Sequence, residues 1–117
     1  LVIAPQQAES QINGALIMGI AYSLFEQRIN DPATGAFVNC DLANYKLARL
    51  GDIGEFVVEF YEPESERKRG VIGLGEPPVI APGAAISNAV ANALGVRVSP
   101  LPLTPQRVLA ALKKAKA

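Results

Sequence analysis

Histidine and tryptophan are absent from the 117 residues, and cysteine occurs once, at Cys40. A single thiol forms no internal disulfide, and it cannot supply the four thiolates of an iron-sulfur cluster or of a structural zinc site. Without histidine, the commonest metal ligand and general base is also missing. The sequence therefore predicts no metal ligands on this chain, and any metal must arrive with its own ligands or on another segment.

The chain also lacks an excess of either charge and a long apolar run. Eleven basic and eleven acidic side chains cancel, so no overall field gathers nucleic acid or anionic lipid. The uncharged stretch at residues 10–25 is interrupted by glycines and polar residues, and it falls short of the ~20 apolar residues of a membrane span. We expect a cytoplasmic protein with no nucleic-acid partner and no membrane span.

Length and composition fit one modest domain. Half of the residues are apolar, and a chain of this size buries roughly two thirds of the surface that its unfolded form exposes. The sequence opens with LVIAP rather than with methionine, and no signal-peptide pattern precedes it. We expect residues 1–117 to form a single piece without an internal boundary, cut from a longer protein.

Apolar spacing and turn residues predict an α+β fold in which helices pack on a small mixed or antiparallel sheet. Helices are expected over three segments: residues 5–26, where apolar side chains recur every four positions, residues 84–94, and residues 105 onward. Strands are expected over residues 1–4, in a hairpin over residues 28–39 and over residues 54–62. A short edge strand or an extended run is expected over residues 96–102, where two prolines cannot donate to a ladder. The charged segment between residues 62 and 70 is expected to be a solvated loop.

The stretch GVIGLGEPPVIAPG, residues 70–83, holds one carboxylate, Glu76, among four glycines and three prolines. It has neither the third glycine of a dinucleotide fingerprint nor the Gly-Lys-Ser/Thr of a phosphate loop. Pro77 disfavours the α region for Glu76, while Gly73 and Gly75 leave the backbone open to close approach. A carboxylate held in this way suits a general base. The residues taken alone favour the alternative, an ordinary surface glutamate in a proline-rich loop.

Gln11 is a second candidate, on the first predicted helix. It shares one side of that helix with Gly14, and the small residues Gly14, Ala15 and Gly19 would let a neighbour approach closely. The amide could hold a flat polar ligand. The alternative, which the residues alone favour, is a helix packed on another helix with an exposed glutamine. We expect Cys40 to be a small buried apolar residue rather than a nucleophile.

Five ordered motifs make the chain resemble the C-terminal part of the molybdenum-binding subunit of the xanthine dehydrogenase and aldehyde oxidase family. The most specific, G-x-G-E-P-P, is present at residues 73–78. The other four are a glutamine-led helix at residues 11–26, a D-x-x-T-G hairpin at residues 31–35, a tyrosine segment at residues 44–48, and G-x-R-x-x-x-L-P-x-T-P at residues 95–105. Two positions depart from the pattern, since Ala15 stands for a second glycine and Ala48 for a proline.

The resemblance implies a molybdopterin-dependent oxidoreductase and assigns roles to residues that match the motifs. Glu76 would be the general base on the molybdenum-bound hydroxide, with Gln11, Gly14 and Gly75 as cofactor contacts. The implied cofactor is molybdenum-molybdopterin, with its cytosine dinucleotide form as an alternative, and its pterin supplies the sulfur ligands that this chain lacks. The implied reaction hydroxylates an aldehyde or an N-heterocycle such as a purine, with water as the oxygen donor.

The same resemblance implies partners. These are the rest of the molybdenum subunit, iron-sulfur and FAD-carrying domains or subunits, and a small-molecule substrate. A purine, another heterocycle, an aldehyde and carbon monoxide all stay open as substrates. Because the family's other cofactor loops lie upstream of Leu1, the chain alone is expected to be inactive. The alternative function is a noncatalytic C-terminal module that mediates subunit contact.

Overall fold

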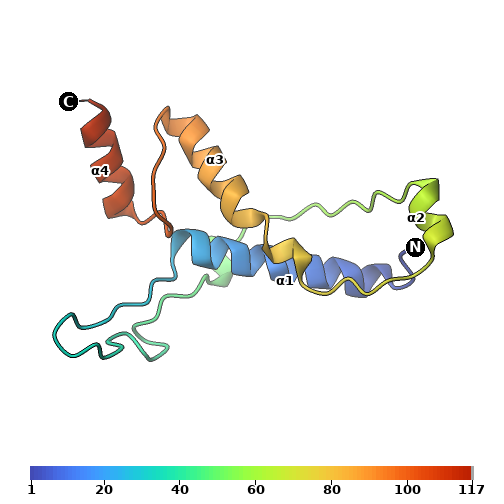
Figure 1. Cartoon of the computed structure of the whole chain (residues 1–117), viewed down its shortest axis with the longest axis horizontal. Helices are drawn as coiled ribbons and strands as arrows, with labels where there is room; N and C mark the ends of the chain where they lie inside the picture. Colours follow the sequence, from blue (N-terminus) through green and yellow to red (C-terminus); the bar gives the residue numbers. More distant parts are fainter. Residues whose placement is uncertain (117) are drawn as a thin grey trace.

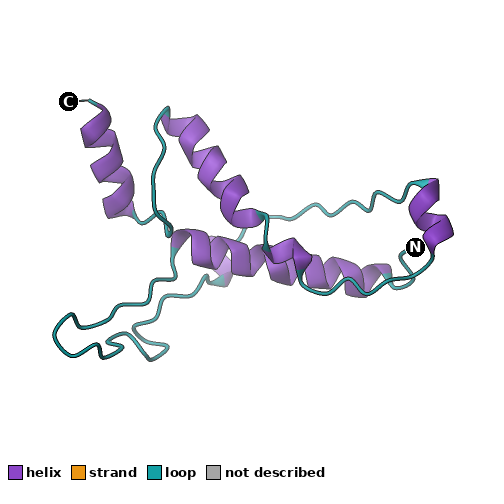
Figure 2. Cartoon of the chain, in the orientation of Figure 1, coloured by secondary structure: helices purple, strands orange, loops and turns teal. Residues whose placement is uncertain are grey.

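The computed structural model describes residues 1–116, and their regular structure is helical (Figures 1 and 2). Four α-helices and two short 3-10 helices follow one another along the chain: α1 (Pro5–Leu24), η1 (Leu50–Asp52), α2 (Glu64–Arg69), η2 (Pro77–Val79), α3 (Pro82–Leu94) and α4 (Pro105–Ala115). The long helix α1 runs through the middle of the molecule. Helices α3 and α4 lie toward one of its ends, and α2 lies near the N-terminus at the other (Figure 1).

The prediction of an α+β fold with a small sheet is wrong. Residues 1–116 contain no sheet, and their only pairing of this kind is an isolated antiparallel bridge between Asn30 and Phe37 in the predicted hairpin. Residues 54–62 cross from η1 to α2 as an extended segment without a paired neighbour (Figure 1). The physical reason is that β-propensity reports fit to a pleated neighbour, and no such neighbour is present in the part described.

The predicted helices are confirmed, with small shifts at their ends. Proline stands in the first turn of α1, α3 and α4, where its missing N–H costs nothing. Thr104 caps α4, because its hydroxyl accepts a hydrogen bond from the Arg107 backbone N–H at 3.4 Å. Gly95 ends α3 with a φ of 67°, in the left-handed region. The solvated loop expected after residue 62 instead contains α2, whose six residues carry acidic side chains first and basic ones last.

The core lies where the second half of α1 meets η2 and the start of α3. The buried positions of α1 are its small residues, namely Ala15, Gly19, Ala21 and Ser23. Its large apolar residues at positions 12, 16, 20 and 24 are only half-buried. A Cβ placed on Gly19 would overlap the Cβ of Pro82 and lie 2.7 Å from its Cγ. The small face of α1 therefore allows the start of α3 to pack directly on its backbone, as the spacing of Ala15 and Gly19 indicated.

Outside this contact the fold is open. The radius of gyration is 18.2 Å, whereas a compact domain of this length has about 13 Å. The buried apolar side chains are Ala15, Ala21, Val98 and Leu103. Large apolar residues are exposed along the extended segments, including Val57 at 80% and Tyr61 at 89%. The position of the loop at residues 75–83 therefore depends on contacts with α1 rather than on a surrounding core.

Candidate functional site

The loop that carries Glu76 turns sharply into η2. Gly75 has a φ of 61°, which favours glycine, and Glu76 follows with φ −115° and ψ 12°. Glu76 thus lies outside the α region as Pro77 predicted, although in the bridge region rather than in the extended region usual before proline. Its carbonyl accepts a hydrogen bond from the Val79 N–H at 3.1 Å. The peptide is held in this turn while the carboxylate side chain is exposed.

Gln11 meets this loop directly. Its Nε2 donates a hydrogen bond to the Gly75 carbonyl at 2.8 Å, across 64 positions of sequence. Two of the candidate residues named from separate motifs, Gln11 and Gly75, are therefore in contact, and Glu76 is the next residue along. Gly14 lies one turn further along α1, and no atom lies within 4 Å of a Cβ built on it. The structure brings Gln11, Gly75 and Glu76 together and leaves Gly14 on an open part of the helix.

A groove of about 740 Å³ lies between the first half of α1 and the two chain segments around residues 60–62 and 71–77. Its volume is in the range of small-molecule sites. Gln11, Gly73, Gly75 and Pro77 are among its lining residues, whereas Gly14 and Glu76 are not. Glu76 therefore stands between two residues that line the groove, although it is not a lining residue itself.

The residues of this groove fit a cofactor that brings its own metal ligands. Within residues 1–116 no three His, Cys, Asp or Glu side chains gather into a possible metal site. One polar group of the groove remains available, because Gln11 Oε1 is an acceptor that is not used in the bond to Gly75. A Cβ on Gly73 would meet nothing within 4 Å. A flat polar group can approach the backbone here.

Sequence reasoning missed Tyr22, which holds the other end of the Glu76 loop. Its hydroxyl donates a hydrogen bond to the Val79 carbonyl at 2.9 Å and accepts one from the Gly83 N–H at 2.9 Å. A Cβ on Gly83 would lie 2.7 Å from the Tyr22 ring. The available signal was its spacing, because Tyr22 follows Gln11 by eleven positions, about three helical turns, and so lies on the same face of α1.

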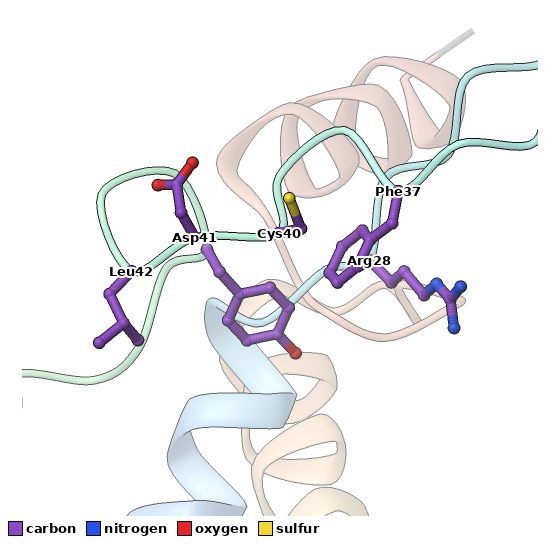
Figure 3. Close-up of a pocket in the computed structure, with 6 residues that line it drawn as sticks. Arg28, Phe37, Cys40, Asp41 and Leu42 are labelled. Atoms are coloured by element: carbon purple, nitrogen blue, oxygen red, sulfur yellow. The ribbon is translucent and has the colours of Figure 1, made fainter.

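A second pocket of about 400 Å³ lies apart from this loop, between the hairpin and the segment after it (Figure 3). Its lining residues are Arg28, Phe37, Cys40, Asp41, Leu42 and Tyr45. The Arg28 guanidinium lies 5.0 Å from the centre of the Phe37 ring, and Phe37 meets Tyr45 edge to face. Cys40 is exposed here, so its expected burial is wrong. Segment 40–44 turns back on Asp41 rather than entering the core.

Comparison with known proteins shows the family to which this chain belongs. The sequence model of the molybdopterin cofactor-binding domain matches residues 1–54, which include Gln11 and Gly14. The chain is 42% identical over 110 residues to the xanthine dehydrogenase molybdenum-binding subunit of Escherichia coli O157:H7, covering 92% of this chain and 14% of that subunit. It is 37% identical over 111 residues to the aldehyde oxidoreductase molybdenum-binding subunit of Escherichia coli strain K12, covering 92% and 15%.

A solved structure supports the same family. Quinoline 2-oxidoreductase from Pseudomonas putida 86 superposes with a TM-score of 0.83 at 27% identity, over 97% of this chain and 15% of that one. The chain belongs to the molybdenum-binding subunits of the xanthine dehydrogenase and aldehyde oxidase family, which are molybdopterin oxidoreductases. It spans about one seventh of the length of the curated relatives, at 14% to 15%. No helix within residues 1–116 is long and apolar enough to cross a membrane.

Proposed function

We propose that this chain is the C-terminal portion of the cofactor site of a molybdenum hydroxylase and that Glu76 is its general base. The observation that supports this most is the hydrogen bond from Gln11 to Gly75. It joins the segment matched by the cofactor-binding domain, residues 1–54, to a loop that lies outside that match. A cofactor held against Gln11 would therefore lie beside the peptide that carries Glu76.

Each residue of this chain has a defined task in the proposed site. The bound cofactor supplies the centre that takes two electrons from the substrate. Gln11 offers its free amide oxygen to the cofactor, while Gly14 and Gly75 keep the backbone accessible. Glu76 Oε accepts the proton of the attacking oxygen, which comes from water. The turn into η2 holds the Glu76 backbone before reaction, which is what a general base requires.

The substrate class follows from the relatives. Their printed names include xanthine dehydrogenase, aldehyde oxidoreductase, nicotine 6-hydroxylase and quinoline 2-oxidoreductase. We propose an aldehyde or an N-heterocycle for this chain as well. The finer parts of the proposal are a cofactor in the cytosine dinucleotide form and partner domains or subunits that carry iron-sulfur clusters and FAD. These partners would take the electrons onward, because residues 1–117 hold one cysteine.

Replacing Glu76 with glutamine in the intact enzyme tests the assignment. The variant Glu76→Gln preserves size and leaves Pro77 in place, but it removes the basic site. We expect bound molybdenum to be unchanged while the rate of cofactor reduction by substrate falls by about 10²-fold or more. The matched control is Glu59→Gln, which changes an exposed glutamate on residues 54–62. Rapid mixing that finds Glu76→Gln within a few-fold of the parent would favour the noncatalytic module instead.

A further inference from the structure

Tyr22 ties two successive elements, η2 and the start of α3, to α1 through one hydroxyl group. As donor it binds the Val79 carbonyl of η2, and as acceptor it binds the Gly83 N–H of α3, both at 2.9 Å. These bonds span 57 and 61 positions of sequence. The phenol hydroxyl is partly buried. Both of its hydrogen-bonding functions, as donor and as acceptor, are satisfied by backbone groups of this chain.

The start of α3 depends on this hydroxyl. The first N–H groups of a helix have no partner within the helix, and a side chain at the N-cap usually satisfies one of them. Ala81 at the N-cap of α3 has no such side chain, and Pro82 has no N–H. Gly83 provides the next free donor, and Tyr22 accepts from it. A residue of a different helix therefore does the work of the cap.

A short path of hydrogen bonds leads from Tyr22 to Glu76. The Tyr22 hydroxyl binds the carbonyl of Val79, and the N–H of Val79 binds the carbonyl of Glu76 at 3.1 Å. On the other side, Gln11 binds the carbonyl of Gly75. The Glu76 peptide thus lies between two anchors on the same face of α1, about three helical turns apart.

We propose that Tyr22 is a positioning residue for Glu76. This inference rests on the proposed function, because it assigns Tyr22 a task only if Glu76 is the base. The Tyr22 hydroxyl fixes η2 and the start of α3 against α1, and so fixes the direction in which the Glu76 carboxylate leaves the turn. The Tyr22 ring has a separate, packing role against Gly83.

The variant Tyr22→Phe in the intact enzyme separates the hydroxyl from the ring. We expect full cofactor content, an unchanged KM, and a rate of cofactor reduction about 3- to 10-fold lower, as the loss of one or two hydrogen bonds implies. Amide hydrogen exchange should accelerate in peptides that cover residues 76–85, because Gly83 loses its acceptor. The control Tyr45→Phe removes a hydroxyl that binds Glu26 at 2.9 Å, and it should leave both readouts unchanged.

A double-mutant cycle distinguishes positioning from a general structural effect. If Tyr22 acts through Glu76, Tyr22→Phe costs no further rate once Glu76→Gln is present. A loss that persists in the Glu76→Gln background would overturn the inference, and so would a Tyr22→Phe enzyme with the parent rate. Failure of the proposed function looks different, because Glu76→Gln alone would then keep the parent rate.

Discussion

Two loops of this chain are stabilised in different ways. Residues 75–83 are tied to α1 by side chains that lie 57 to 64 positions away. Residues 28–44 are instead held by bonds among near neighbours, in which Asp31 accepts from the N–H groups of Ala33 and Thr34, and Asp41 from those of Ala43 and Asn44. The first loop has its shape only when α1 is packed beside it, whereas the second carries its shape in its own sequence.

This difference fits the proposed role of the loop at residues 75–83. A general base must keep its position relative to a cofactor that other residues hold. Its loop must therefore be fixed to a rigid element. Helix α1 serves as that element because its small face allows Pro82 to approach closely. The hairpin loop makes no comparable set of contacts with α1. Substitutions on the face of α1 should therefore disturb residues 75–83 first.

The largest effect on folding is expected from a change at Gly19. Gly19→Ala places a methyl group against Pro82, with 2.7 Å to its Cγ, and overpacking of this kind costs about 1–3 kcal/mol. Gly14→Ala is the matched control on the same helix, because its Cβ meets nothing within 4 Å, and the gain in helix propensity is up to about 1 kcal/mol. Thermal unfolding of the intact enzyme should shift in opposite directions for the two variants. Equal shifts would contradict the close contact at Gly19.

A larger side chain at Gly14 sharpens the comparison between packing and cofactor binding. Gly14→Leu points into open space in this structure, so we expect no loss of thermal stability but a lower molybdenum content after purification. Metal analysis and thermal unfolding of the same preparation measure both. A variant that keeps full cofactor but melts far lower would make Gly14 a packing residue only.

The same contrast explains how much the sequence could predict. Four predicted features depend on residues close in sequence, and all four are confirmed. They are the helix starts at Pro5 and Pro105, the end of α3 at Gly95 and the turn at Asp31. The strand predicted over residues 54–62 failed because a strand needs a partner, which local sequence does not contain.

Contacts between residues that are distant in sequence could not be predicted either. Gln11 and Gly75 were both named as candidates, but their mutual hydrogen bond could not be predicted from either motif. Tyr22 was missed altogether, because one aromatic residue on an apolar helix gives no local sign that its hydroxyl will cap another helix. The sequence therefore named Gln11 and Gly75 as candidates, but it could not predict the long-range contacts that orient their loop.

The smallest effect is expected in the hairpin loop. The Ala33 and Thr34 N–H groups that bind Asp31 lower the pKa of its carboxyl below the usual value of an aspartate. Because the folded pKa is depressed, the stabilisation of this turn is present above the unfolded value and is lost as the pH falls through the folded pKa. Asp31→Asn removes the charge but keeps an acceptor. Amide hydrogen exchange of residues 28–36 near neutral pH should accelerate by about two- to five-fold.

The control for this variant is Asp41→Asn, which makes the same change in the second turn. The pKa of Asp41 is lowered by its hydrogen bonds with the Asn44 side chain, the Asn44 backbone and the Ala43 backbone. Its substitution should affect residues 40–46 and leave residues 28–36 as they are. Neither change should alter exchange in residues 75–83, because that loop is anchored on Gln11 and Tyr22. Faster exchange there in Asp31→Asn would show that the two loops are coupled, and the distinction between local and distant anchoring would then be wrong.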